Sequence, residues 1–516
     1  MAIATLIRPP SIVGRYALTL NGTPPLSAAY LAGSLTAAGH EVQVIDAVGE
    51  ALHAMHPGYR PDILINGLTV AQIVERIRPD CQFVGISCLF SHEWPLIREL
   101  VAAIAARFAD VPIALGGEHA TAVPELCLDE SPLLTACALG EGEETIVELV
   151  QACAVEGAEA RARALAAVAG LVLRGPHGPL RTAPRARIRD IDDIPAPRWD
   201  LTPIEPYLAG GFSFGVDRGR TMPLLATRGC PYSCTFCSSP KMWTTRYSTR
   251  SPALVVDEIE DFVRRYRAEN FDFYDLTAII ERDWILEFCR LLDARQLHIT
   301  WQLPSGTRSE ALDEETLRAM YRSGCRNVSY APESGSPRTL QAIKKKVKLE
   351  RLEASMRAAV RAGLNVKANI LIGFPDESIE DLRETLRFVV RMARIGVHDA
   401  SVWTFSPYPG SELFDGLRAA GKLPRLDDDY YAALLSYSDI SGATSYATAL
   451  DSKQLQRYRL AGLLLFYGAS YLTHPARPVR SLYNIATRRY ESRMEMSFGN
   501  LVRRLATARA HMLSSS

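Results

Sequence analysis

Three cysteines stand close together in one short segment of this chain. Cys230, Cys234 and Cys237 are separated by four and three residues, in a stretch that also contains Gly229 and Pro231. Thiolates at this spacing on one loop can bind three corners of an iron–sulfur cluster or of a metal site. A closed four-thiolate zinc site would need a further ligand from elsewhere in the chain. A three-cysteine cluster instead leaves one iron open to a ligand that is not protein, as cluster-driven catalysis requires.

The composition excludes several classes of protein. The 516 residues include 58 Lys plus Arg against 58 Asp plus Glu, so the zero formal charge argues against a nucleic-acid partner. Ten cysteines without a recognisable secretory signal indicate reduced thiols. The apolar stretches fall short of the roughly 20 residues that cross a bilayer. We expect a cytoplasmic protein of two to four domains that acts on a small molecule, with no membrane span.

The first 150 residues alternate strand and helix signals, which is typical of a doubly wound parallel sheet. The predicted strands cover 2–6, 42–45, 83–87, 111–115 and 136–139, and the predicted helices cover 26–38, 94–108 and 144–153. Ligands of such sheets bind beyond the carboxyl ends of the strands. Several glycines lie there, and glycine lets backbone approach a bulky ligand closely. A purely structural flavodoxin-like domain, with glycines that serve only turns, would explain the same pattern.

A second alternation starts near residue 223. Its predicted strands are 224–227, 271–276, 299–303, 327–330, 366–372 and 400–405, with helices between them. Six strand–helix repeats with short connections predict a partial (β/α)6 barrel whose active site lies at the carboxyl ends of the strands. The cysteine segment follows the first of these strands. We therefore expect an α/β protein with a first Rossmann-like domain over 1–155, a linker over 156–215, the barrel over 216–412 and a mainly helical cap over 413–516.

The cysteine segment resembles the signature of the radical S-adenosylmethionine (SAM) superfamily. The pattern C-x-x-x-C-x-x-C, with an aromatic residue before the last cysteine, is met by Cys230, Cys234, Phe236 and Cys237. The resemblance implies a [4Fe-4S] cluster on the three cysteines, whose open iron binds SAM. Reductive cleavage of SAM would then yield a 5'-deoxyadenosyl radical. It also implies an external electron donor of the flavodoxin or ferredoxin type.

Further segments resemble the parts of that superfamily that contact SAM. The second strand end at 273–277, the segment 333–336 and the turn at 373–375 occupy the corresponding places. The usual G-x-I-x-x-x-G pattern is not intact, because Lys367 and Asn369 occupy its first and third positions. Arg308 would pair with the SAM carboxylate or form a surface salt bridge. The cofactor-binding residues implied here are Phe236, Asp275, Arg308, Glu333, Ser334, Asn369 and Gly373.

The first domain resembles the cobalamin-binding domain that is fused to many radical SAM enzymes. The resemblance rests on the run from Pro24 to Glu41, on Gly116 to Thr121 and on Gly140 to Glu143. No histidine stands in the D-x-H-x-x-G motif, so the cobalt is expected to lack that axial histidine. His119 either approaches the corrin or is a hydrogen-bonded turn residue, and Cys88 is favoured as a small buried hydrophobe. The implied cobalamin contacts are Ser87, Cys88, Gly116, Gly117, His119, Gly140, Glu141 and Gly142.

The overall build resembles the group that holds anaerobic magnesium-protoporphyrin ester cyclases and lipid or antibiotic C-methylases. This resemblance implies methylation of an unactivated carbon: one SAM methylates cobalamin, and a second gives the radical that activates the substrate. Oxidative cyclisation or rearrangement without methyl transfer is the first alternative, and a non-catalytic cobalamin or redox sensor is the second. The substrate is expected to be a small molecule, hydrophobic or not.

The charge of the chain is unevenly distributed. From Asp451 onward eleven basic and three acidic residues give a net charge of +8. Such a tail can contact an anionic lipid surface as a peripheral protein does, or it can be an arginine-rich helical surface without a partner.

Overall fold

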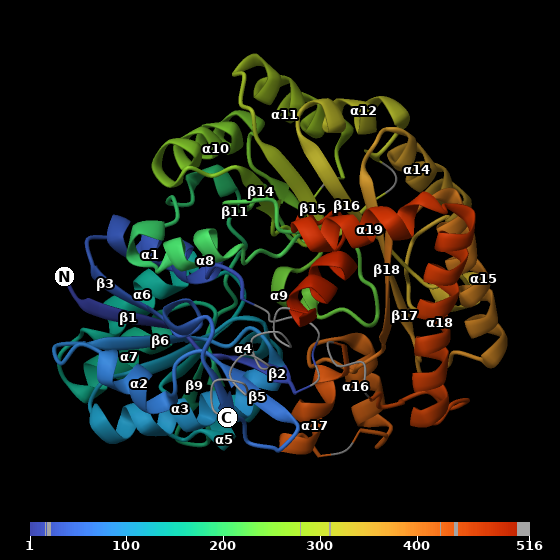
Figure 1. The fold of residues 1–516 in the computed structure, drawn as a ribbon. Helices are drawn as coiled ribbons and strands as arrows, with labels where there is room; N and C mark the ends of the chain where they lie inside the picture. The colour runs from blue at the N-terminus through green and yellow to red at the C-terminus, as the bar shows by residue number, and fades with distance from the viewer. Residues whose placement is uncertain are drawn as a thin grey trace, which may run out of the picture.

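The computed structural model describes residues 1–15, 17, 22–278, 280–308, 311–423, 425–437 and 442–502. Two lobes lie side by side, one around a sheet that contains β1 and one around a sheet that contains β14 to β18 (Figure 1). The short helix α9 (Ser239–Trp243) lies between them.

The first sheet has seven strands in the order β10-β9-β8-β7-β6-β1-β3. Its five parallel strands are β1 (Ile3–Arg8), β3 (Glu41–Asp46), β6 (Phe83–Ser87), β7 (Ile113–Gly116) and β8 (Ala136–Ala138). This is the flavodoxin-like order, in which the chain changes direction across the sheet between β1 and β6. The predicted doubly wound sheet is therefore confirmed. An antiparallel hairpin of β9 (Leu171–Gly175) and β10 (Gly178–Arg181), inside the expected linker, extends the same sheet.

Helices cover both faces of this sheet. One apolar core contains side chains of α1 and α6, and the other contains side chains of α2, α3 and α5. The helices of this lobe are α1 (Leu26–Ala37), α2 (Val70–Arg76), α3 (Trp94–Arg107), α4 (Glu118–Ala122), α5 (Pro124–Glu130), α6 (Glu143–Cys153) and α7 (Ala158–Ala167). A small sheet of β2 (Ser11–Gly14), β5 (Ile63–Asn66) and β4 (Met55–Pro57) was not predicted, because its three- and four-residue strands show no clear alternation.

The second sheet is the predicted partial barrel. Six strands pair in parallel and in chain order: β11 (Thr221–Leu224), β14 (Asn270–Phe273), β15 (Thr300–Thr307), β16 (Cys325–Glu333), β17 (Asn365–Ile372) and β18 (Asp399–Thr404). The first strand ends three residues earlier than predicted. Thr227 and Arg228 form β12 and pair instead with β13 (Ser248–Thr249) in a separate two-stranded ribbon.

The helices of the barrel lie outside its sheet (Figure 1). They are α10 (Pro252–Tyr266), α11 (Arg282–Ala294), α12 (Glu314–Arg322), α13 (Pro337–Ala342), α14 (Leu349–Arg361) and α15 (Ile379–Ile395). Burial alternates along β17, where Val366, Ala368 and Ile370 are buried in the core shared with the helices. Lys367 and Asn369 therefore point to the other face of this strand, toward the interior of the barrel.

The C-terminal helices divide between the two lobes. Phe414 of α16 (Glu412–Ala419) and Tyr430 and Tyr431 of α17 (Asp428–Ala433) are buried in a core of the first lobe. Leu455 and Phe466 of α18 (Ser452–Thr473) are buried in the core of the barrel. The chain continues with α19 (Ala476–Thr487) and a helix over 493–502. The expected cap thus covers parts of both lobes.

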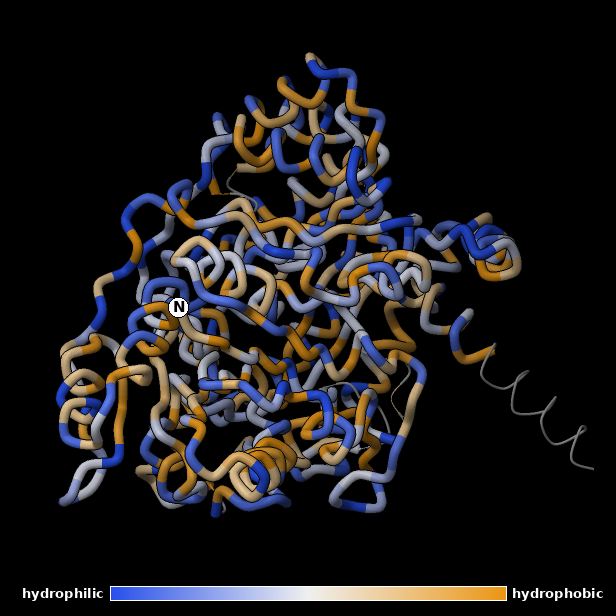
Figure 2. The backbone as a smooth tube through the Cα atoms, turned by 90° about the vertical axis from the view of Figure 1, so that its left-hand side faces the viewer, coloured by the Kyte–Doolittle hydropathy of each residue, from blue (hydrophilic) through white to orange (hydrophobic). Residues whose placement is uncertain are grey.

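The helices of the described residues carry mixed side chains. Hydrophobic and hydrophilic residues alternate along the outer helices in Figure 2. Among the helices that the structure describes, none has both the length and the apolar character needed to cross a lipid bilayer.

Candidate functional site

The cysteine segment leaves the ribbon β12 through a turn that requires glycine. Gly229 has φ of +83°, and a Cβ at this position would lie 2.1 Å from the carbonyl oxygen of Arg246. A side chain there would collide with backbone, in a conformation that L residues rarely adopt. The turn therefore places Cys230 directly after the ribbon.

All three cysteines are unpaired and partly exposed. Burial raises the pKa of the Cys237 thiol to about 12, and it also raises the pKa of the Cys234 thiol, where nearby Lys345 opposes the shift. A metal site must displace these protons to bind thiolates. Across the described ranges, no three His, Cys, Asp or Glu side chains converge as ligands of a single metal ion.

Asp275 holds the strand that leads into the cysteine loop. Its fully buried carboxylate accepts hydrogen bonds from the backbone N–H of Ala226 at 3.1 Å, from the N–H of Thr227 and from the Thr227 hydroxyl at 2.5 Å. Burial raises the pKa of Asp275 to about 6. The structure therefore shows Asp275 bracing the loop, and its expected contact to SAM stays a prediction.

Charged side chains surround Cys234. Lys345 and Glu333 form an ion pair of 2.9 Å, and both side chains are nearly buried. The guanidinium of Arg308 lies 3.9 Å from the ring centroid of Tyr232 in the cysteine loop, and it donates to the carbonyl of Lys346. The predicted residues Glu333 and Arg308 thus meet beside the loop, rather than on the outer surface.

The aromatic residue of the signature lies between the cysteine loop and the fifth barrel strand. The Phe236 ring packs at 5.6 Å from the ring of Phe374, in the turn after β17. Gly373 has φ of +86° in that turn, and its N–H donates to Glu377 at 2.5 Å. Phe236 and Gly373 therefore belong to one contact between the loop and the barrel.

Ser334 and Asn369, two further predicted SAM contacts, have different surroundings. The Ser334 hydroxyl bonds the hydroxyl of Thr385 on α15 at 2.9 Å, so it faces a helix. The side-chain oxygen of Asn369 is buried without a hydrogen-bond partner. Because Asn369 points toward the barrel interior, it is available there to a ligand.

The carboxyl edge of the first sheet contains open space beside two glycines. A Cβ on Gly116, at the end of β7, would meet no atom within 4 Å, and one on Gly140, after β8, would meet only the Met242 carbonyl oxygen at 3.6 Å. Gly117 has φ of +113°, and a Cβ there would lie 2.7 Å from the Cys88 carbonyl oxygen. Neighbouring strands thus present bare backbone at the edge where flavodoxin-like sheets bind ligands.

The other residues expected at this edge are more enclosed. Ser87 is the last residue of β6 and is partly exposed, whereas Cys88 is fully buried. Nδ1 of His119 lies 2.9 Å from the Ser91 hydroxyl, and burial lowers the pKa of His119 to about 3. His119 is therefore neutral, with one nitrogen in a hydrogen bond inside the first lobe.

Glu141 and Gly142 lie where the edge meets the linker. The buried Glu141 carboxylate accepts from Arg187 Nε and from the N–H of Ile188, both at 2.9 Å, and Gly142 is the N-cap residue of α6. Sequence reasoning missed Arg187 and Lys345, because each meets its partner only through the folded chain. Arg228, directly before Gly229, is seen in the sequence, but the sequence does not show which carboxylates it pairs with.

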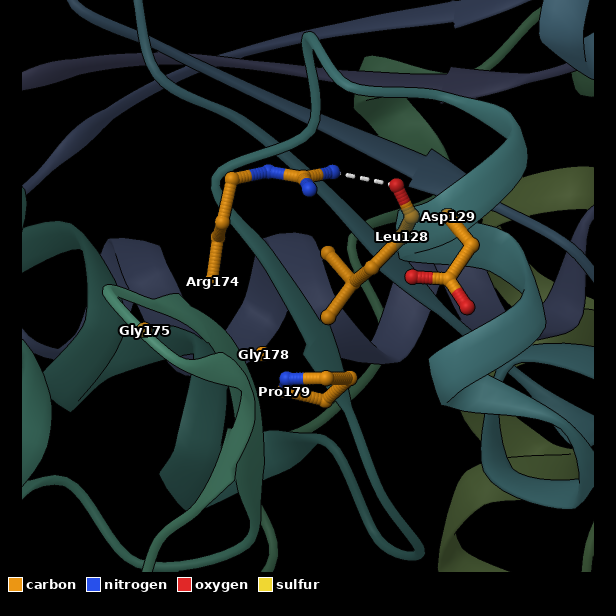
Figure 3. Close-up of a pocket in the computed structure, with 6 residues that line it drawn as sticks. All are labelled: Leu128, Asp129, Arg174, Gly175, Gly178 and Pro179. Atoms are coloured by element: carbon orange, nitrogen blue, oxygen red, sulfur yellow. Dashed lines mark hydrogen bonds between the residues drawn. The ribbon is translucent and has the colours of Figure 1, made fainter.

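A separate hollow of about 190 Å³ lies beside the β9–β10 hairpin, lined by Leu128, Asp129, Arg174, Gly175, Gly178 and Pro179. In Figure 3, Arg174 reaches across it to the Leu128 carbonyl oxygen. Its walls come from an edge of the first sheet and from α5, and they include none of the predicted site residues.

Comparison with known proteins identifies both halves of this arrangement. The sequence model of the radical SAM superfamily matches residues 224–389, and that of the B12 binding domain matches residues 17–150. An uncharacterized methyltransferase of Pyrococcus horikoshii is 31% identical over 76% of this chain and 78% of its own length. The anaerobic magnesium-protoporphyrin IX monomethyl ester cyclase of Rubrivivax gelatinosus is 30% identical over 76% of this chain and 66% of its own length.

A solved structure shares the fold. The cobalamin-dependent S-adenosylmethionine radical enzyme OxsB, solved with aqua-cobalamin and S-adenosylmethionine, superposes with a TM-score of 0.69 at 15% identity. The superposition covers 99% of this chain and 72% of OxsB. The two matched domains, in this order and on this fold, identify the chain as a member of the cobalamin-dependent radical SAM enzymes, which use a [4Fe-4S] cluster, SAM and cobalamin.

Proposed function

We propose that this enzyme methylates an unactivated carbon of a small-molecule substrate. The observation that carries the proposal is the direct contact between the cysteine segment and the open edge of the first sheet. Ser238, one residue after Cys237, donates its hydroxyl to Glu118, and the Thr121 hydroxyl lies 3.3 Å from Met242 Sδ. The two segments proposed to hold the cofactors therefore meet at α9, which supports transfer of a group between them.

The residues present fit the cofactors of the family. Cys230, Cys234 and Cys237 offer three thiols for a [4Fe-4S] cluster and leave one iron open. The open space beside Gly116 and Gly140 fits a large planar ligand such as cobalamin, which bare backbone can approach closely. When bound, the cluster supplies the electron that cleaves SAM, and cobalamin serves as the carrier of the methyl group.

The side chains around the cysteine loop have distinct parts in this proposal. Glu333, Lys345 and Arg308 place both signs of charge beside Cys234, which suits the amino and carboxylate groups of SAM. Asn369 offers its unpartnered oxygen from the barrel interior. The contact of Phe236 with Phe374 places apolar atoms on that side of the loop, where they would help to exclude water.

Product analysis under anaerobic turnover tests the proposal. S-adenosylhomocysteine and methylated product that form in step with 5'-deoxyadenosine support methyl transfer. The cyclase of Rubrivivax gelatinosus, at 30% identity, favours oxidative cyclisation as the second candidate. That candidate predicts 5'-deoxyadenosine without S-adenosylhomocysteine. A non-catalytic sensor would give neither product, even with an external one-electron donor such as reduced flavodoxin.

The surface of α19 supports a peripheral contact with an anionic lipid surface. Val479, Leu482 and Tyr483 are 70%, 69% and 58% exposed, whereas Ser481 and Asn484 are buried and bond the Glu495 carboxylate. The helix thus turns its apolar stripe outward, and exposed arginines follow at 488 and 489. Co-sedimentation with phosphatidylglycerol vesicles, but not with phosphatidylcholine vesicles, is the expected result. Leu482→Glu should abolish it, and equal binding to both vesicles would contradict the role of charge.

A further inference from the structure

One arginine connects the cysteine segment to the first lobe. Arg228, two residues before Cys230, is 5% exposed and forms an ion pair with Glu143 of α6. Its guanidinium also lies 3.5 Å from the carboxylate of Glu141, in the loop between β8 and α6. The rings of Tyr30 and Trp243 flank it, with centroids at 5.6 and 5.9 Å. The two loops assigned to the two cofactors are therefore joined through buried charges.

A second arginine completes this contact. Arg187 pairs with Glu141 at 2.9 Å, and it donates to the carbonyl oxygens of Trp243 and Arg246. Its guanidinium lies 5.3 Å from the Trp243 ring centroid. Because Arg246 also blocks the Cβ direction of Gly229, the same few atoms define both the turn before Cys230 and the position of Glu141.

The energetics indicate a geometric role for these pairs. Desolvation of two charges roughly cancels their attraction, so a buried pair contributes little net stability. Removal of one partner leaves an unpaired buried charge, however, and the surrounding groups must then move or admit water. Arg228 also holds the pKa of Glu143 below its ordinary value, although burial alone would raise it. The attraction to Arg228 therefore keeps Glu143 ionised although the carboxylate is buried.

We propose that Arg228 is a positioning residue that, through Glu141 and Glu143, sets the separation and orientation of the cluster loop relative to the cobalamin loop. The inference rests on the proposed function and deepens it. Methyl transfer requires the activated substrate carbon to reach both cofactor sites in one geometry, whereas SAM cleavage needs the cluster site alone. Loss of Arg228 should therefore uncouple the two events rather than stop SAM cleavage.

Arg228→Gln tests this, with Arg228→Lys as the conservative variant. Arg185→Gln is the matched control, because Arg185 pairs with Glu144 and Glu148 on the outer part of the same helix. In Arg228→Gln we expect at least a fivefold fall in methylated product per 5'-deoxyadenosine. Lysine makes no bidentate pair and should restore part of this ratio. Arg185→Gln should keep the wild-type ratio.

Two measurements do not depend on turnover. The reduced cluster enhances the electron-spin relaxation rate of cob(II)alamin, and in Arg228→Gln this enhancement should be smaller and the rates should cover a broader range. The spectrum and the occupancy of each cofactor should stay unchanged. The wild-type apoprotein should unfold in one transition, whereas Arg228→Gln should show separate transitions for the two lobes. Wild-type values for product ratio, relaxation and unfolding would overturn the inference.

The design separates this inference from the proposed function. If the wild type makes no methylated product, the proposed function fails, and the relaxation and unfolding measurements still decide the positioning role. If Arg228→Gln is insoluble, Glu143→Gln interrupts the same pair from the other lobe and carries the same expectations. Wild-type behaviour of that variant in all three measurements would also overturn the inference.

Discussion

Substitution of Asp275 by Ala should remove the support of the cysteine loop. The backbone N–H groups of Ala226 and Thr227 would each lose their acceptor in a fully buried site, and the Thr227 hydroxyl would keep only the Thr277 carbonyl oxygen at 3.5 Å. Each of the two buried N–H groups without a partner costs about 1–3 kcal/mol, so we expect a loss of about 2–6 kcal/mol in the free energy of unfolding. Since total stabilities are about 5–15 kcal/mol, the variant would be close to the limit of folding. Asp275→Asn keeps one acceptor and should lose about 1–3 kcal/mol.

The assay combines urea unfolding of the apoprotein with iron content after anaerobic reconstitution. Asp272→Ala is the matched control, because Asp272 is equally buried on β14 and accepts from Gly215 N–H at 2.6 Å and from Asn270 at 3.2 Å. Both substitutions should reduce stability, but only those at Asp275 should reduce iron per folded chain. The reasoning is refuted if Asp275→Ala unfolds like the wild type. It is equally refuted if the Asp272 variant loses as much iron.

Three further results are expected. Cys234→Ala should abolish the absorbance of the cluster and all SAM cleavage while cobalamin stays bound to the first lobe, and retained cleavage would contradict the cluster assignment. Gly116→Leu should fill the open space and prevent cobalamin from co-eluting with the folded protein, whereas Gly416→Leu, at an equally open position, should not. Burial lowers the pKa of His119 to about 3, so at a pH below about 6.5 the unfolded state binds a proton at His119 and the native state does not. The free energy of unfolding therefore decreases as the pH falls below about 6.5. From pH 7 to pH 5 the His119 contribution amounts to about 2 kcal/mol, and unfolding of His119→Gln should show a pH dependence smaller by that amount.

The architecture of both sheets could be predicted because strand and helix periods alternate along the chain with clear boundaries. Phe83–Ser87 was predicted with the bounds that the structure has. The first barrel strand was placed three residues late, since the apolar run continues through Ala226 while the pairing of Thr227 with Thr249 is a tertiary contact. No local pattern reports such a contact.

The residue types of the candidate site could be predicted from the sequence, but the hydrogen bonds and ion pairs between these residues could not. The three cysteines and the glycines of the first sheet are recognisable because their chemistry depends on local spacing and on backbone freedom. Asp275 bonds backbone 48 and 49 residues away, and Arg187 pairs with Glu141 across 46 residues. Partners at such separations are chosen by the folded topology, so hydrogen bonding inside the site could be seen only in the structure.

The packing of α17 has a consequence for how the chain is assembled. Tyr430 and Tyr431 complete an apolar core of the first lobe together with Trp94 and Leu128, although the whole barrel lies between them in the sequence. A ribosome therefore synthesises all six barrel strands before the last residues of the first-lobe core emerge. Until then, the nascent first lobe exposes an apolar cleft that chaperones or neighbouring chains can bind. The apolar core of the first lobe is therefore completed near the end of synthesis rather than at the beginning.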